Sequence, residues 1–417
     1  MNNESIFHAL SLSTDCVDAA QSSGYTTPTS IQIDAIPTIL DGRDLIATAP
    51  TGSGKTLAYC LPLLDLICTS SPNSRRDPRV LILVPTRELA AQVGDVLTGL
   101  IRNLSNLKIK LSIVFGGVSI NPQMMQLRGG SDIVVATPGR LLDLLGSNAL
   151  HLSDVRTLVL DEADRLLDAG FSEELNRILG YLPAKRQHVF FSATFPDSLK
   201  ELAAKHLHNA VELLDGNSAE QGGQIEQRAI EVDAAKRTQL LIHLFKASGW
   251  NRALVFVATK YATKHIAEKC NRAGLIAEAF NGDMSQGARS GALSALKASK
   301  VQIIVTTDLA SRGIDIDNLP VVVNYDLPRS VDDYIHRIGR TGRAGQAGVA
   351  ISFVSPQTDA HFRLIEKRQG HTIHRQRVVA FEPTAAAIAA HNPVGGIKGK
   401  RPNKKDKLRA FLAADPQ

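Results

Sequence analysis

The sequence has few of the features that mark a membrane, secreted or zinc protein. No uninterrupted apolar run reaches the roughly 18 residues that a membrane-spanning helix needs. The start, Met-Asn-Asn-Glu, lacks the basic residues and the apolar stretch of a signal peptide. The four cysteines lie far apart and form no Cys-x-x-Cys pair, which argues against zinc and against a disulfide framework. We therefore expect a cytoplasmic protein that binds neither membranes nor zinc.

Neither basic nor acidic residues predominate along the chain, except in one short segment. The chain has 47 basic and 41 acidic residues, a net charge of +6. The surplus lies in residues 398–409, where seven basic residues accompany one acid. This run is either a solvated chain end or an electrostatic tether to phosphates, and the sequence leaves both open.

The length of 417 residues suits two domains of about 200 residues each. Several short apolar runs are continuous and not alternating, which is typical of buried parallel strands. The predicted strands are residues 44–47, 80–84, 133–136, 158–160, 189–191, 253–257, 303–305, 321–323 and 349–353. Segments between them, such as 86–97 and 141–145, have helical periodicity. The alternation predicts an α/β fold with helices on both faces of a mainly parallel sheet in each half.

The two halves are separated by residues 215–226, which are polar and rich in glycine and predict a flexible linker. We therefore predict one domain over residues 1–214 and a second over 227–375. The remaining tail, 376–417, is first rich in alanine and then basic, and we expect it to be disordered.

Unusual polar segments begin where the apolar runs of the first half end. They occupy residues 49–56, 85–90, 137–140, 161–164 and 192–194. Ligands of open parallel sheets bind at the carboxyl ends of the strands. These segments therefore predict one extended active surface along a sheet edge.

The first of these segments predicts a phosphate-binding loop. Its residues are Ala49, Pro50, Thr51, Gly52, Ser53, Gly54, Lys55 and Thr56. The glycines allow backbone N–H groups to surround phosphate, Lys55 is expected to pair with the β- and γ-phosphates, and Thr56 to ligate Mg²⁺. Ala49 replaces the first glycine of the usual pattern, and a plain glycine-rich turn is the alternative.

Two carboxylates follow the apolar run 158–160. Asp161 is placed to hold Mg²⁺ through water, and Glu162 can polarise the attacking water. The alternative is an acidic helix start that the helix dipole favours.

The second half has no phosphate-binding loop, but it contains His336, Arg337, Arg340 and Arg343. Arginines three residues apart share a face if the segment is helical, and they suit either γ-phosphate contacts or a basic exposed helix.

These motifs together resemble the DEAD-box RNA helicases over nearly all of residues 1–375. Residues 161–164 spell the Asp-Glu-Ala-Asp tetrad. The segment with Tyr25 and Gln32 is similar to the family's adenine-reading motif, so Gln32 is expected to bind the adenine edge and Tyr25 its face. The resemblance implies ATP, Mg²⁺ and two tandem RecA-like domains.

The resemblance also implies roles in coupling and catalysis. Asp164, Ser192 and Thr194 would couple the ATP state to domain closure, Asp315 would contact the ribose, and Arg340 and Arg343 would reach the γ-phosphate beside His336. RNA contacts carry over to Pro85, Thr86, Arg87, Gly116, Gly117, Thr137, Pro138, Gly139, Arg140, Gln286, Arg289, Thr307 and Asp308.

The RNA contacts imply recognition of the backbone. Aromatic residues are only 5% of the chain, so platforms of stacked bases are a poor fit. Glycines and arginines at strand ends suit backbone tracking, and contacts to 2′-hydroxyls favour RNA over DNA. We expect local unwinding of short duplexes without long translocation.

The short N-terminus and brief basic tail are most similar to the bacterial RhlE-type subgroup. Departures from the family are Ser311 in place of alanine and a loose motif at residues 255–259. A DNA translocase of the same layout and an ATP-gated RNA clamp remain alternatives, separable by which nucleic acid stimulates ATP hydrolysis. Ribosomal precursors and the RNA decay machinery are the expected partners.

Overall fold

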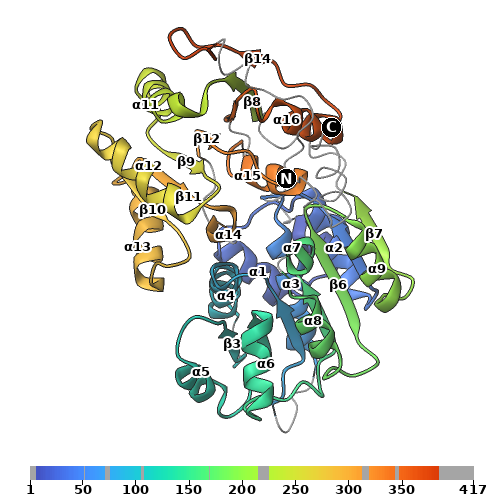
Figure 1. Cartoon of the computed structure of the whole chain (residues 1–417). Helices are drawn as coiled ribbons and strands as arrows, with labels where there is room; N and C mark the ends of the chain where they lie inside the picture. The colour runs from blue at the N-terminus through green and yellow to red at the C-terminus, as the bar shows by residue number, and fades with distance from the viewer. Residues whose placement is uncertain are drawn as a thin grey trace, which may run out of the picture. The chain divides into compact units, whose positions relative to one another are not determined.

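The computed structural model describes residues 6–50, 52–70, 76–104, 108–168, 170–214, 225–311, 319–342 and 347–384. The chain forms two compact units, one holding residues up to 224 and one holding nearly all of the chain after it. Each unit is a parallel sheet with helices packed on it (Figure 1). The predicted α/β architecture is therefore confirmed.

The first unit contains a seven-stranded parallel sheet in the order β3-β4-β2-β5-β6-β1-β7. Its strands are β1 (Leu45–Thr48), β2 (Val80–Leu83), β3 (Leu111–Val114), β4 (Ile133–Ala136), β5 (Thr157–Leu160), β6 (Gln187–Ser192) and β7 (Val211–Leu214). Its helices are η1 (Ile6–Leu10), α1 (Thr14–Ser22), α2 (Ser30–Leu40), α3 (Lys55–Thr69), α4 (Arg87–Arg102), α5 (Ile120–Leu127), α6 (Pro138–Gly146), α7 (Ala163–Asp168), α8 (Ser172–Leu179) and α9 (Asp197–His206).

Both faces of this sheet are buried, because successive side chains of a strand point to opposite sides. In β2, Val80 and Ile82 join the core beneath α1 to α4, whereas Leu81 and Leu83 join the core beneath α6 to α9. This is why the central strands appear in the sequence as unbroken apolar runs.

The second unit repeats the plan, with sheet order β10-β11-β9-β12-β13-β8-β14. Its strands are β8 (Ile225–Glu231), β9 (Ala253–Phe256), β10 (Ala277–Phe280), β11 (Ile303–Thr306), β12 (Val321–Asn324), β13 (Gly348–Val354) and β14 (Arg375–Gln376). Its helices are η2 (Ala234–Lys236), α11 (Arg237–Ser248), α12 (Lys260–Arg272), α13 (Gln286–Lys297), α14 (Asp308–Ser311), α15 (Val331–Ile338) and α16 (Asp359–Gln369).

The domain ends differ in detail from the prediction. Ile225 and Glu226, assigned to the linker, begin β8, and the rest of the linker lies outside the described residues. The second unit continues past residue 375, because β14 pairs with β8 and Val378 and Phe381 pack against the core. The basic run 398–409 lies outside the described residues.

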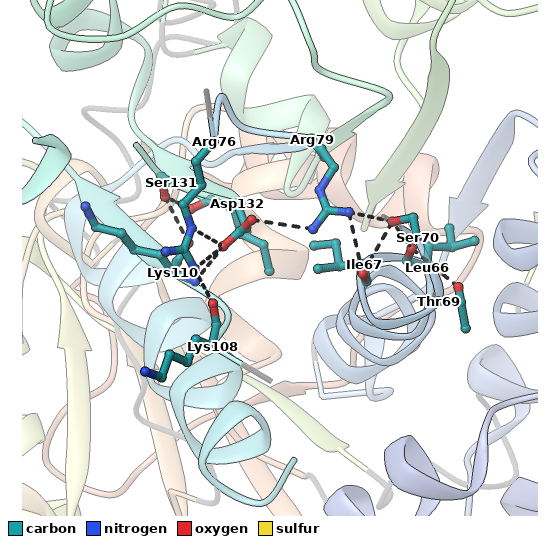
Figure 2. A network of polar contacts seen from close by, with 11 residues as sticks. Leu66, Ile67, Thr69, Ser70, Arg76, Arg79, Lys108, Lys110, Ser131 and Asp132 are labelled. Atoms are coloured by element: carbon teal, nitrogen blue, oxygen red, sulfur yellow. Dashed lines mark hydrogen bonds and ion pairs between the residues drawn. The ribbon is translucent and has the colours of Figure 1, made fainter. Parts of the chain in front are cut away.

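A polar network fastens the amino ends of β2 and β4 in the first unit (Figure 2). Asp132 accepts ion pairs from Arg76 at 3.1 Å and from Arg79 at 3.4 Å, and its carboxylate also accepts the backbone N–H of Lys110. Arg79 further reaches the carbonyl of Ile67 near the end of α3. The charged side chains at this end of the sheet are therefore occupied by contacts within the first unit.

None of the helices in the described ranges is long and apolar enough to cross a membrane.

Candidate active site

The predicted phosphate-binding loop joins the end of β1 to the start of α3. Gly52 and Gly54 adopt φ angles of 89° and 93°, in the left-handed region that favours glycine. A Cβ atom on Gly54 would lie 2.4 Å from Nε2 of Gln32. The loop therefore requires glycine at this position, and it leads directly into the N-terminus of a 15-residue helix, a favourable place for phosphate.

Gln32 of α2 holds this loop from the other side. Its Oε1 accepts the backbone N–H of Thr29 at 3.0 Å, and its Nε2 donates to the carbonyl of Gly54 at 3.1 Å. The Thr29 hydroxyl donates to the carbonyl of Ser53 at 2.8 Å. The predicted adenine-reading residue is thus fastened to the predicted phosphate loop. Tyr25 precedes α2 and packs partly buried against the core, which raises its pKa.

Lys55 is buried, and its ammonium group donates to the carbonyl of Ala49 at 2.7 Å. The hydroxyl of Ser53 donates to the carbonyl of Pro50 at 2.8 Å. The lysine therefore lies folded over the loop backbone. Thr51 lies outside the described residues.

Asp161 follows β5 and is only 3% exposed. One carboxylate oxygen accepts the hydroxyl of Tyr59 at 2.8 Å, and the other accepts the backbone N–H of Glu162 at 2.9 Å. Burial raises the pKa of Asp161 to about 6, an effect that the Lys55 ammonium opposes and the Glu162 carboxylate reinforces. The hydroxyl of Thr56 also interacts with Tyr59, which brings Thr56 close to Asp161.

Glu162 has an uncommon backbone conformation for a residue with a side chain, with φ at 50°. Its carboxylate pairs with Arg165 at 3.2 Å, and both side chains are 8% exposed. Backbone strain of this kind costs about 1–3 kcal/mol and concentrates at functional sites. The conformation is therefore an observation in favour of the predicted role of Glu162 that does not depend on its sequence motif.

The tetrad is connected to the segment after β6. Asp164 is 1% exposed, and its Oδ2 accepts both the backbone N–H of Thr194 at 3.0 Å and its hydroxyl at 2.7 Å. The hydroxyl of Ser192 accepts the backbone N–H of Asp164 at 3.2 Å. The three residues predicted to couple domains thus form one continuous contact.

A shallow depression of about 350 Å³ lies at the carboxyl ends of β2, β3 and β4. Its lining residues are Pro85, Arg87, Gly116, Gly117, Thr137, Gly139, Arg140 and Phe171. Two further predicted RNA contacts begin the adjoining helices, since Thr86 caps α4 and Pro138 is the first residue of α6. The structure therefore gathers the RNA-contact set of the first half in one place.

Two arginines line this depression in different ways. Arg87 extends across Gly117, where an added Cβ would lie 2.7 Å from its Nη1. Arg140 donates from Nη2 to the carbonyl of Val118 at 2.6 Å, but its Nε and Nη1 are buried without a hydrogen bond. The exposed carboxylate of Asp143 forms an ion pair with Nε at 3.6 Å, which is longer than a hydrogen bond. Arg140 therefore keeps donor capacity beside this pair, as its predicted contact with an anionic RNA backbone requires.

In the second unit, Arg337 is buried in the last turn of α15. It forms a two-pronged ion pair with Asp308, at 2.5 and 2.8 Å, and lies 4.8 Å from the ring centre of Phe256. The helix ends at Ile338, so Arg340 follows it and does not share a helical face with Arg337. Arg343 and Asp315 lie outside the described residues. His336 and Arg340 are both buried, at 6% exposure.

The remaining predicted RNA contacts lie at the carboxyl ends of β10 and β11. Gln286 begins α13, and Thr307 stands between β11 and α14. Arg289 is 3% exposed, donates to the carbonyl of Ala310 at 2.9 Å and lies 4.2 Å above the ring of Phe280. In both units, the predicted RNA contacts therefore lie along the carboxyl edge of the sheet.

Comparison with known proteins agrees with this arrangement. The DEAD/DEAH box helicase model matches residues 29–202, and the helicase conserved C-terminal domain model matches residues 236–345. The crystal structure of a DEAD box protein from the hyperthermophile Methanococcus jannaschii is 37% identical, with a TM-score of 0.52; the match covers 89% of this chain and 98% of that one. The chain belongs to the DEAD-box family.

Two relatives of this DEAD-box protein carry further information. S. cerevisiae Dbp5 bound to RNA and ADP BeF3 is 30% identical with a TM-score of 0.79, over 89% of this chain and 95% of that one. ATP-dependent RNA helicase DeaD of Klebsiella pneumoniae is 39% identical over 370 residues, which are 89% of this chain and 57% of the relative. The chain thus spans less than two thirds of that curated relative, and the RhlE-type subgroup remains a prediction.

Phe171 is the lining residue of this DEAD-box protein that sequence reasoning missed. It precedes α8 and packs partly buried against the core. It stands ten residues after Asp161, and no strand end or glycine motif distinguishes it. Its only signal was an aromatic side chain directly before a predicted helix in a chain with few aromatics.

The buried tetrad carboxylate predicts a pH-dependent stability. Because burial raises the folded-state pKa of Asp161 to about 6, its ionisation costs stability that builds up as the pH rises from about 4 to about 6 and stays constant above that. Asp161→Asn should therefore stabilise the first unit by roughly 2 kcal/mol at pH 7.5, from a two-unit shift less one weakened hydrogen bond. The gain should disappear near pH 4, where both forms of the protein carry a neutral group.

Calorimetric melting at both pH values measures this difference. Asp18→Asn, an exposed carboxylate on α1, is the matched control and should change neither transition. An Asp161→Asn protein that melts at or below the parent temperature at pH 7.5 would contradict the prediction.

Proposed function

We propose that this DEAD-box protein is an RNA-dependent ATPase that locally unwinds short RNA duplexes or remodels RNA–protein complexes by closing its two domains on ATP and RNA. The observation that carries the proposal is the carboxyl edge of the first sheet. Along that edge lie the predicted phosphate loop after β1, Asp161 and Glu162 after β5, and the arginine-lined depression at β2, β3 and β4, which supports the proposal. The structural relative Dbp5, which is bound to RNA and ADP BeF3, supports the same pair of ligands.

In this proposal, the nucleotide phosphates lie on the loop and the N-terminus of α3. Lys55 must leave the carbonyl of Ala49 to pair with phosphate, an exchange that costs one hydrogen bond and gains a charge pair. Glu162 accepts a proton from the attacking water, and its pairing with Arg165 fixes the carboxylate in place. Arg340, Arg343 and His336 supply the positive charge and hydrogen bonds of the second domain at the γ-phosphate.

The donor set beside the loop fits Mg²⁺. Thr56 and Asp161 offer a hydroxyl and a carboxylate, the oxygen ligands that this ion prefers. The buried Asp161 carboxylate, whose pKa is raised, is also a group that a nearby cation stabilises in its ionised form. Mg²⁺ bound there would neutralise phosphate charge.

RNA is proposed to bind through its backbone in the depression. The buried donors of Arg140 suit a phosphate oxygen, and the glycines at 116 and 117 let a backbone approach closely. The hydrogen bonds of Asp164 with Ser192 and Thr194 are proposed to couple RNA binding in this depression to the ATP site. We further propose a cytoplasmic setting, with ribosomal precursors or the RNA decay machinery as the source of RNA.

Steady-state ATP hydrolysis tests the proposal. The rate should be low without nucleic acid, rise strongly with single-stranded RNA and rise little with DNA of the same sequence. Equal stimulation by DNA would favour a DNA translocase, and no turnover with saturating RNA would favour an ATP-gated clamp.

The RNA depression has its own test. Arg140→Ala should weaken RNA binding by about tenfold and reduce the slope of affinity against salt by about one phosphate contact. Arg102→Ala is a matched control, because Arg102 is exposed at the opposite end of α4. If both variants bound RNA like the parent protein, the depression would not be the RNA site.

A further inference from the structure

Tyr261 is a large aromatic side chain that the fold leaves exposed. It lies in the first turn of α12 and is 78% exposed. Its ring lies parallel to that of His265, with centroids 5.8 Å apart and an interplanar angle of 15°. The two residues are four positions apart and therefore share one helix face. Together they form a flat, solvent-facing ring surface in a chain with few aromatic residues.

The helix holds this surface in a fixed direction. Thr259 caps α12 by accepting the backbone N–H of Ala262 at 3.1 Å. The opposite face of the helix is buried in the core through Thr263, Ile266 and Cys270. The rings therefore point away from the core, and the stacked imidazole restricts the rotation of the tyrosine.

The surface lies on the edge that carries the predicted RNA contacts of the second unit. α12 follows β9, and β9 pairs with β11, whose carboxyl end leads to Thr307. Lys260 forms an ion pair at 2.5 Å with Asp283, in the loop that leads to Gln286. The first turn of α12 is thus joined directly to the segment that begins α13.

The charge around the rings favours a polyanion. Lys260 and Lys264 are exposed on either side of Tyr261, and Asp283, the partner of Lys260, offsets one of these two positive charges. A flat ring next to ammonium groups is the combination with which proteins bind single-stranded nucleic acid, where bases stack and phosphates are neutralised. A protein partner would instead require a wider apolar surface than one aromatic pair.

We propose that Tyr261, supported by His265, stacks on an unpaired base of the bound RNA and extends the RNA path of the second unit beyond Gln286 and Thr307. The inference rests on the proposed function, because it needs RNA at this edge. It adds a contact to a base face in a site otherwise directed at the backbone. Since every base has such a face, the contact gives affinity without sequence preference.

Binding of single-stranded RNA to the full chain, in the presence of AMP-PNP, tests this inference. RNAs with 2-aminopurine at successive positions should show quenching at one position, and Tyr261→Ala should remove it. The same variant should weaken binding about fivefold, the effect of losing one stacked base at an exposed site. Tyr261→Phe should retain both properties, and the salt dependence should be unchanged in both variants, because no charge is lost.

Tyr181→Ala is the matched control, as an exposed tyrosine of the first unit. If Tyr261→Ala bound RNA like the parent while Arg140→Ala bound weakly, the stacking surface would be excluded and the proposed function would stand. Equal weakening by Tyr261→Ala and Tyr261→Phe would assign the effect to the hydroxyl and overturn stacking. If the parent protein did not bind RNA, the proposed function itself would be contradicted.

Discussion

Replacing Glu162 with glutamine should lower RNA-stimulated ATP turnover by about 10²- to 10⁴-fold, the range expected for loss of a general base. Glutamine has the same shape and can still accept a hydrogen bond from Arg165, which pairs with Glu162 at 3.2 Å. It also meets the same backbone constraint at φ 50°. The change therefore removes the proton acceptor and leaves the loop and the neighbouring carboxylate in place.

Two measurements separate chemistry from binding. Steady-state hydrolysis with saturating RNA should show the loss, whereas titration with a fluorescent ATP analogue should give a dissociation constant within about twofold of the parent. Glu173→Gln, an exposed residue of α8, is the control and should hydrolyse ATP normally. Turnover of the Glu162 variant within tenfold of the parent would assign the base to another group.

Arg337→Ala should destabilise the second unit by about 3–5 kcal/mol, the usual effect of breaking a buried ion pair. The guanidinium is 3% exposed and joins Asp308, Asn324 and the carbonyl of Asp326. Its removal leaves the carboxylate of Asp308 without its two-pronged partner and leaves a cavity above Phe256. Arg337→Lys should lose less, because it keeps the charge but not the fork geometry.

The single tryptophan makes this measurement specific. Trp250 packs against the core of the second unit, so its fluorescence during urea unfolding reports on that unit. Arg363→Ala removes a 74% exposed partner of Asp359 and should change stability by less than about 0.5 kcal/mol. An Arg337→Ala midpoint equal to that of the parent would show that the pair is not structural.

The sequence predicts strands well where both of their faces are buried. Each predicted run overlaps an observed strand, and 133–136 matches β4 from end to end. The missed strands are β3, β7, β8, β10 and β14, and they lie at or next to the sheet edges. In β3, Ser112 interrupts the apolar pattern, and in β7 partly buried and exposed positions alternate. A strand with one covered face carries no continuous apolar run.

The sequence likewise predicts some parts of the candidate site and not others. Loop glycines and strand-end acids are local signals, and the structure places them along one edge. The tie between Gln32 and Gly54 spans 22 residues, and the pair of Arg337 with Asp308 spans 29, so neither follows from periodicity. The three-residue spacing predicted a shared face only for a continuous helix, and for Arg337 and Arg340 that condition is not met, because α15 ends at Ile338.

The tie between Gln32 and the phosphate loop has a consequence for nucleotide choice. A planar amide can donate two hydrogen bonds and accept two. Gln32 uses one N–H on Gly54 and one lone pair on Thr29, so its amide keeps one N–H and one lone pair. The 6-amino group and N7 of adenine match that pattern, whereas O6 and N7 of guanine are both acceptors and leave the lone pair facing an oxygen. If Gln32 binds the base edge as the sequence predicts, we expect the amide that holds the loop to disfavour a guanine nucleotide as well.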